Sequence, residues 1–293
     1  MTEDMAMTSD VRILRELAKR VKAAAESQDR ERLKRLWRKL HDREMERPMI
    51  YIWVILFTEE LEEITALQCT HPLFRQKEKE LRTELYHYYT GDDYLIEPYI
   101  VLQASHTGLE HGHWGMQFPS RPSPGGAADM FPDPPIKSLD DLSLLRPAQH
   151  CVDEERTAAN RKMLEDAVGD IMPVHLARTP VLYQAPMASM AMFLRGMTQI
   201  MLDMVENPSK LHRLLRIMKQ IGGDYIISWR PNPTDHVCAT FDRDRIRRQI
   251  AQGRDILAKH GCQYEINLKD VLTVRGDREL LREWVKIVRS VTE

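Results

Sequence analysis

Short apolar segments alternate with amphipathic segments over residues 48–293, and this alternation leaves few possible architectures. Segments rich in β-branched and aromatic residues, typical of buried strands, occur at 49–56, 94–102, 170–176, 181–186, 224–229 and 263–268. Spacings typical of helices occur at 58–68, 73–91, 154–168, 190–220, 242–260 and 277–292. Strands that alternate with helices form mostly parallel sheets covered on both faces, so an α/β fold is expected.

The first 47 residues differ from the rest of the chain. Residues 8–46 carry apolar side chains at helical spacings among dense mixed charge, and the sequence Ser-Gln-Asp at 27–29 predicts a break between two helices. Acidic residues are interleaved with the basic ones, which favours a solvated helical hairpin packed on the main domain over a nucleic-acid surface. We therefore expect a hairpin at 1–47 and a main domain at 48–293.

Charge and hydropathy limit the possible partners and location. A formal net charge of -2 argues against broad electrostatic binding to nucleic acid or to an anionic membrane. The longest apolar stretch, at 48–57, is about half of what spans a bilayer, and the first residues lack the basic-then-apolar pattern of a secretion signal. The four cysteines form no Cys-x-x-Cys pair and are expected to be reduced thiols. A cytoplasmic protein is expected.

Two predicted strands end in polar and charged residues. In parallel α/β folds ligands lie beyond the carboxyl ends of the strands, because the loops there vary while the strands hold them rigidly. The expected substrate-binding residues at these ends are Trp229, Arg230, Asn232, Asn267 and Arg275, and the expected catalytic residues are Lys269 and Asp270. The alternative is that Lys269 and Asp270 form only a solvated turn and that Arg230 pairs with a neighbouring helix.

Several stretches resemble the uroporphyrinogen decarboxylase-like superfamily. The resemblance covers most of residues 80–291 and is strongest in the last part, at 223–233, 241–250 and 264–288. Residues 185–215 are similar to the middle signature of that superfamily, in which a proline precedes a glycine by ten residues. Asp93 precedes Pro98 by five positions, as an aspartate does in its early strand. The resemblance implies a (β/α)8 TIM barrel with Asp93 as a catalytic residue.

The chain departs from the decarboxylases of that superfamily at three places. Nothing near residues 40–60 reproduces their arginine-rich loop for substrate carboxylates. Met192 stands where their middle signature has a tyrosine, and Lys269-Asp270 stands where a histidine-glycine pair is expected. Of that catalytic set only Asp93 is present.

A second branch of the superfamily comprises corrinoid-dependent methyltransferases, which bind zinc through His-x-Cys and a later cysteine. Zinc suits this reaction because it holds a thiol as the more nucleophilic thiolate. His236 and Cys238 match His-x-Cys and are the candidate metal ligands, but Cys262 precedes the strand at 263–268 instead of following it. The strand should separate Cys262 from the His236–Cys238 loop by roughly 20 Å.

A complete barrel has eight strands, whereas six strand segments are found here. The expected fold is therefore a shortened or incomplete (β/α)8 barrel. Because open sheet edges are hazardous, another chain is expected to complete it, in a homo- or hetero-oligomer.

Three functions follow from these observations as hypotheses. The first is methyl or one-carbon transfer linked to a corrinoid (cobalamin), with zinc as a second cofactor and with Asp93 or Asp270 moving protons. The second is decarboxylation of a tetrapyrrole acetate side chain, in which Asp93 faces the pyrrole nitrogens and Arg230 a propionate. The third is a non-catalytic truncated barrel that binds a tetrapyrrole, a corrinoid or a partner subunit through the helical hairpin.

Overall fold

The structure is a computed structural model that describes residues 3–108, 121–122, 129–130, 151–178 and 226–293. The chain divides into two compact units. The first comprises residues 1–100, 164–173 and 217–293, and the second comprises residues 101–163 and 174–216. The predicted strand at 181–186, the predicted helix at 190–220 and the matched signature at 185–215 lie outside the described residues.

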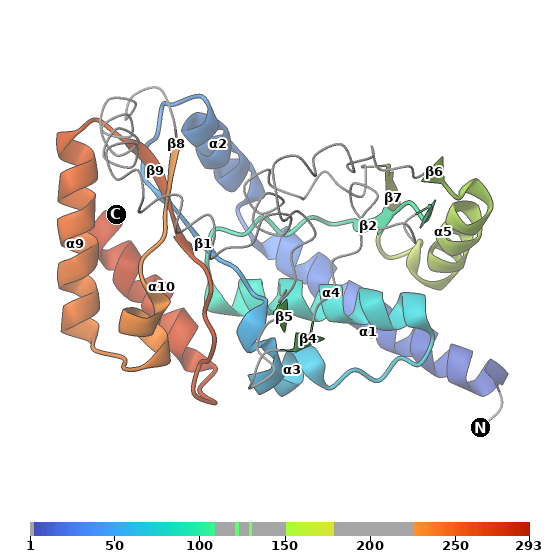
Figure 1. The fold of residues 1–293 in the computed structure, drawn as a ribbon. Helices are drawn as coiled ribbons and strands as arrows, with labels where there is room; N and C mark the ends of the chain where they lie inside the picture. The colour runs from blue at the N-terminus through green and yellow to red at the C-terminus, as the bar shows by residue number, and fades with distance from the viewer. Residues whose placement is uncertain (1–2, 109–120, 123–128, 131–150, 179–225) are drawn as a thin grey trace, which may run out of the picture. The chain divides into compact units, whose positions relative to one another are not determined.

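A three-stranded parallel sheet organises the first unit (Figure 1). Its order is β1 (Met49–Ile52), β9 (Gln263–Leu268) and β8 (Ile226–Trp229). In the register, Ile50 pairs with Ile266 and Ile227 pairs with Tyr264. The first strand of the chain therefore lies beside the last one, and all three strands run in the same direction.

Helices α9 (Arg243–Lys259) and α10 (Glu279–Thr292) follow β8 and β9 and pack together. Between β8 and α9 lies the short helix η5 (Thr234–Cys238). The apolar face of α10 explains its position, because Leu281, Trp284 and Val288 are fully buried with Ile266 and Leu268 of β9 in one core cluster. The side chain of Asp242 caps α9 by accepting hydrogen bonds from the backbone N–H groups of Asp244 and Arg245.

The amino-terminal part contains α1 (Glu3–Ser27), α2 (Arg30–His41), η1 (Leu56–Glu60), α3 (Glu62–Thr65) and α4 (Pro72–Thr90). The predicted break at 27–29 separates α1 from α2, and Asp29 caps α2 through a hydrogen bond from the N–H of Arg32. Helix α1 packs against α4, and both belong to the same compact unit as the sheet. Gly91 ends α4 with φ of 71°, a left-handed conformation that suits glycine.

The described residues of the second unit form short strands and most of helix α5. The elements are β2 (Ile100–Gln103), β3 (His106–Thr107), β4 (Arg121–Pro122), β5 (Asp129–Met130), β6 (Cys151–Val152), α5 (Glu154–Val168) and β7 (Val174–Ala177). β2 pairs with β7, and the pairs β3 with β6 and β4 with β5 are antiparallel. Only the last residues of α5 and the first residue of β2 belong to the other unit.

The fold is mixed α/β, as the alternation predicts, and the strands of the described residues form no closed barrel. Strand β9 occupies the predicted range, 263–268, and α5 occupies 154–168. Three other predicted strands are shorter. β1 ends at Ile52, and the hydroxyl of Thr58 then donates to the carbonyl of Ile55 as η1 begins.

Hydrogen bonds also explain the other two shortened strands. The backbone of Tyr94 and Ile96 bonds to the side chain of Gln28, at 2.8 and 3.1 Å, instead of to a neighbouring strand. The prediction of a strand from residue 94 is therefore wrong, and β2 begins only at Ile100. After α5 the N–H groups of Ile171 and Met172 bond to the carbonyl of Val168, which delays β7 to Val174.

Candidate functional site

The carboxyl ends of β1, β9 and β8 lie on one edge of the sheet because the three strands are parallel. Ile52 pairs with Leu268, and Trp229 pairs with Ile266. Arg230 follows β8, and Lys269 and Asp270 follow β9, so these predicted site residues lie at the same edge. We call this region the carboxyl edge; it comprises Trp53, Ile55, Arg230, Lys269, Asp270 and Leu272.

The strand period of two separates the side chains of the sheet into two sets. Along β9, Tyr264, Ile266 and Leu268 are buried in the core with α9 and α10, whereas the alternate residues Glu265 and Asn267 are only half-buried. Tyr51 of β1 pairs with Asn267, and Ser228 of β8 pairs with Glu265. These four residues, Tyr51, Ser228, Glu265 and Asn267, form what we call the polar face.

Hydrogen bonds on the polar face leave a buried acceptor without a partner. The hydroxyl of Ser228 donates to Oε1 of Glu265 at 2.8 Å. In the described part of the chain, Oδ1 of Asn267 is buried and accepts no hydrogen bond. A buried acceptor without a donor costs free energy, so this amide can accept a hydrogen bond from a ligand.

Lys269 continues the alternation of β9 beyond Glu265 and Asn267. Its ammonium nitrogen lies 3.8 Å from the centroid of the Trp53 ring, a cation–π contact across the carboxyl edge. Trp53 is 37% exposed, Ile55 47% and Leu272 54%. Three large apolar side chains and one cation therefore lie in the loops that leave two adjacent strands.

The loop after β9 has a fixed conformation. Asp270 and Arg275 have φ of 62° and 55°, in the left-handed region that non-glycine residues seldom adopt. A carboxylate oxygen of Glu60, from η1, accepts hydrogen bonds from the N–H groups of Val274 and Gly276, at 3.2 and 2.9 Å. Both Asp270 and Arg275 are exposed. The loop thus presents these two side chains to solvent from a backbone that Glu60 holds.

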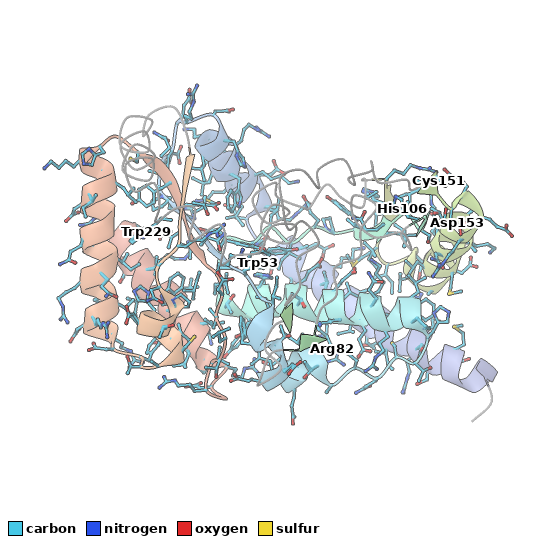
Figure 2. The ribbon with its side chains drawn as sticks, in the orientation of Figure 1. Trp53, Arg82, His106, Cys151, Asp153 and Trp229 are labelled. Atoms are coloured by element: carbon cyan, nitrogen blue, oxygen red, sulfur yellow. The ribbon has the colours of Figure 1, made fainter. Side chains whose placement is uncertain are left out.

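Trp229 faces α9 and lies away from the polar face. Its side chain packs on the core beside Tyr264, with ring centroids 6.3 Å apart. It also fills the space that Gly253 of α9 leaves open, since a Cβ there would be 2.2 Å from the Trp229 ring. Figure 2 shows Trp229 between α9 and the sheet and Trp53 on the other side of the strands. Strand alternation explains this, because Trp229 falls on the same side as Tyr264.

Arg230 and Asn232 leave β8 in a tight turn. The Oδ1 atom of Asn232 accepts a hydrogen bond from the N–H of Thr234 at 3.0 Å, and its amide nitrogen donates to Asp235 at 3.3 Å. The Asn232 side chain thus stabilises the start of η5, which accounts for its presence without a ligand. Arg230 is exposed at the carboxyl edge.

Asp93, expected as a catalytic residue, lies at the amino end of β1, away from Lys269 and Asp270 of the carboxyl edge. Its carboxylate accepts hydrogen bonds from the N–H of Ile50, from both terminal nitrogens of Arg47 and from Arg289. Arg47 precedes β1, so this network surrounds the amino end of the strand. The side chain of Asp93 is 1% exposed.

The protonation state of Asp93 also differs from the expectation. Burial alone would raise the pKa of Asp93, but the hydrogen bonds from Arg47 and the charges of Arg289 and Arg47 outweigh burial and lower the pKa below its usual value. An aspartate that stays ionised between two arginines is a structural anion. It does not exchange a proton near neutral pH, so the expectation that Asp93 carries catalytic protons is not supported by its surroundings.

His236 is a buried structural residue, and the predicted zinc ligands do not fit a zinc site. Nδ1 of His236 accepts a hydrogen bond from the indole N–H of Trp284 at 3.0 Å, so Nε2 carries the proton and donates to Gln249 at 2.8 Å. Burial lowers the pKa of His236, which keeps the ring neutral. Neither nitrogen has a lone pair free for a metal.

Cys238 follows at the end of η5, whereas Cys262 precedes β9 at the opposite end of the sheet. Within the described ranges, no three His, Cys, Asp or Glu side chains are grouped closely enough to hold a metal ion. Both findings agree with the hydrogen bonds that occupy the two ring nitrogens of His236.

A cluster that sequence reasoning missed lies beside the polar face. Nδ1 of His87 is 2.9 Å from Oδ2 of Asp92, and the His87 ring stacks on Tyr94 with centroids 4.1 Å apart. Tyr51 stacks on both rings, and burial, followed by the charge of Asp92, raises its pKa. The signal was present in the sequence, because the left-handed Gly91 after α4 folds Asp92 back onto His87.

Glu84, one turn before His87 on α4, also has unusual surroundings. Among the described residues, its Oε2 atom is buried and has no hydrogen-bond partner. Burial, with a contribution from the charge of Glu80, raises the pKa of Glu84 to about 8. The carboxyl group is therefore protonated near neutral pH, an effect of burial that the sequence pattern does not reveal.

Comparison of the chain with protein-family models, with curated proteins and with solved structures finds no match. In the part of the chain that the structure describes, no helix has both the length and the apolar composition needed to cross a bilayer.

Proposed function

We propose that this chain binds a corrinoid or a related tetrapyrrole at the carboxyl edge and takes part in methyl or one-carbon transfer. The observation that carries the proposal is the combination of exposed apolar side chains, Trp53, Ile55 and Leu272, with the Lys269 cation at adjacent strand ends. A flat macrocycle with polar substituents needs such a surface, apolar over a wide area and polar at its border. When bound, a corrinoid supplies the methyl group.

The strand order supports a barrel-type architecture as part of the proposal. In a closed (β/α)8 barrel the first strand pairs in parallel with the last, and β1 pairs in parallel with β9, which in turn pairs with β8. Helices α9 and α10 follow β8 and β9, as the barrel repeat requires. We propose a shortened barrel related to the uroporphyrinogen decarboxylase-like superfamily, located in the cytoplasm and completed by a second copy or another subunit.

The residues of the site have distinct proposed roles. Lys269 and Arg230 neutralise anionic groups of the ligand or substrate, and Oδ1 of Asn267 accepts a hydrogen bond from it. Asp270, exposed in the fixed loop, is placed to take up the proton of a thiol acceptor. Trp53 provides the surface against which the macrocycle lies.

A demethylation assay tests the reaction. Methylcobalamin is incubated with the full chain and a thiol such as homocysteine, and the absorption spectrum is followed. Turnover is expected, and Lys269→Gln should reduce it, whereas Lys286→Gln, on the exposed side of α10, should not. A wild-type chain that leaves the spectrum unchanged with every thiol tried defeats methyl transfer.

A non-catalytic binding role is the second candidate, and a specific observation favours it. Asp93 and His236, which the resemblance identifies as catalytic or metal-binding, both have their polar atoms engaged within the fold. A chain that binds the macrocycle without turnover would show saturable binding and no demethylation. Tetrapyrrole decarboxylation depended on Asp93, and its buried position between two arginines leaves that alternative without support.

A further inference from the structure

A groove with a volume of about 940 Å³ lies among α1, α3, α4 and the start of α10. All of its lining residues belong to the first compact unit, and none belongs to the polar face or the carboxyl edge. Its size is within the range of small-molecule sites, roughly 300–1,000 Å³. The exposed Ala23 and the buried Ala24 of α1 contribute to its wall, and their small side chains leave the groove wide there.

Positive charge predominates in the lining of this groove. It contains Arg20, Arg82, Arg278 and Arg282, while Glu63 is the only carboxylate among the described residues that line it. Arg82 is neutralised by Glu78 at 2.7 Å, and Arg278 lies 3.3 Å from Glu63. Arg282 is 3.7 Å from the exposed Glu279, a pair that contributes little in water. The groove therefore retains cationic groups that an anion would neutralise.

Tyr89 lies where two of these cations meet. The guanidinium carbon of Arg278 is 4.1 Å from the centroid of the Tyr89 ring, and that of Arg282 is 5.1 Å from it. Like charges repel, so two guanidinium groups over one ring favour an anion that bonds to both. In the described part of the structure the hydroxyl of Tyr89 is buried without a hydrogen-bond partner. It is a further polar group that a ligand can satisfy.

We propose that this groove binds an aromatic anion, a planar ring system that carries a phosphate or carboxylate group. The ring packs between the α1 wall and the tyrosines of α4. Arg278 and Arg282 bond to the anionic group, and Arg20 adds positive charge from α1. The hydroxyl of Tyr89 forms a hydrogen bond with the ligand. Charge and aromatic surface together favour this class over uncharged apolar ligands, which would gain nothing from the arginines.

Fluorescence titration of the full chain with flavin mononucleotide, an aromatic phosphate, tests the proposal. We expect saturable quenching of the fluorescence. Riboflavin, which has the same ring without the phosphate, should bind at least about tenfold more weakly than flavin mononucleotide. Arg282→Ala should weaken binding of flavin mononucleotide by about tenfold. Arg243→Ala removes another arginine with an exposed side chain, on α9, and should leave the affinity unchanged.

Two further measurements separate loss of the site from loss of the fold. Tyr89→Phe retains the ring and removes the hydroxyl, so it should weaken binding severalfold while the melting temperature is maintained. If Arg282→Ala is unstable, Arg20→Ala on α1 removes a different positive charge from the groove and should also weaken binding of flavin mononucleotide. Displacement of flavin mononucleotide by benzene-1,2,4-tricarboxylate would support the proposal. Absence of binding, or equal binding of flavin mononucleotide and riboflavin, would overturn it.

Discussion

Replacement of Asp93 by asparagine separates a structural from a catalytic role for this residue. The carboxylate accepts bonds of 2.7 and 2.9 Å from Arg47, 2.8 Å from Arg289 and 2.8 Å from the N–H of Ile50. Asparagine has a similar volume but no charge, so it leaves Arg47 and Arg289 with the more exposed Glu293 as their anionic partner in place of the buried carboxylate. Loss of one partner of a buried ion pair costs ~3–5 kcal/mol. We expect the free energy of unfolding to fall by that amount.

The free energy of unfolding is measured by urea titration at neutral pH, with circular dichroism as the signal, and the melting temperature by heating the same proteins. For a chain of this size ~3–5 kcal/mol corresponds to a fall of about 10 °C in melting temperature. Asp270→Asn is the matched control, because Asp270 is exposed and asparagine tolerates the left-handed conformation, so its effect should stay below ~0.5 kcal/mol. An Asp93→Asn protein within ~1 kcal/mol of the wild type would refute the reasoning.

The pH dependence of stability provides an independent check on Asp93. The pKa of Asp93 in the folded chain lies below its ordinary value of 3.8. The stabilisation by this carboxylate is therefore fully present above the unfolded pKa and is lost as the pH falls through the folded pKa. In the Asp93→Asn protein this part of the acid-induced loss should be absent.

Three further predictions concern His236, Gly253 and Glu84. His236→Asn should lower the free energy of unfolding by ~2–3 kcal/mol, because the hydrogen bonds to Trp284 and Gln249 are lost. Burial lowers the pKa of His236, so the wild type should also lose stability as the pH falls below 6.5, and the variant should lack this pH-dependent loss. Gly253→Ala places a Cβ 2.2 Å from the Trp229 ring and should cost ~1–3 kcal/mol, so a neutral effect in thermal melting would contradict the packing of Trp229. The pKa of Glu84 is raised to about 8, so the stabilisation by its protonated form is present at low pH and is lost as the pH rises through 8. The melting temperature of Glu84→Gln should therefore exceed that of the wild type at about pH 9, and the two melting temperatures should be similar at about pH 5.

Local pattern was sufficient to predict much of the fold. The apolar alternation of β9 and the helical spacing of α5 gave elements with the predicted bounds, because each buries one continuous apolar set. The strand at 94–102 was predicted too long because the side chain of Gln28, far away in sequence, binds that backbone. Side-chain bonds of this kind have no periodic signature.

The residues of the carboxyl edge were only partly predictable, because contacts between residues distant in sequence also decide their roles. Sequence order and strand direction bring the ends at Arg230 and Lys269 to one edge, and this follows from parallel pairing alone. Which side of the sheet a residue faces depends on register, so the position of Trp229 at a strand end predicts a ligand contact, whereas its side chain faces α9. The roles of Asp93 and His236 depend on Arg289, Trp284 and Gln249, which are distant in sequence.

Absorption titration of methylcobalamin with the wild type and two variants tests the central claim most directly. Leu272→Asp places a charge on the exposed apolar surface of the carboxyl edge, where Leu272 is 54% exposed. Ile256→Asp makes the same change on α9, where the side chain is 60% exposed. We predict saturable binding by the wild type and by Ile256→Asp, and about tenfold weaker binding by Leu272→Asp. Equal binding by all three proteins, or no binding by the wild type, would contradict a macrocycle site at this edge.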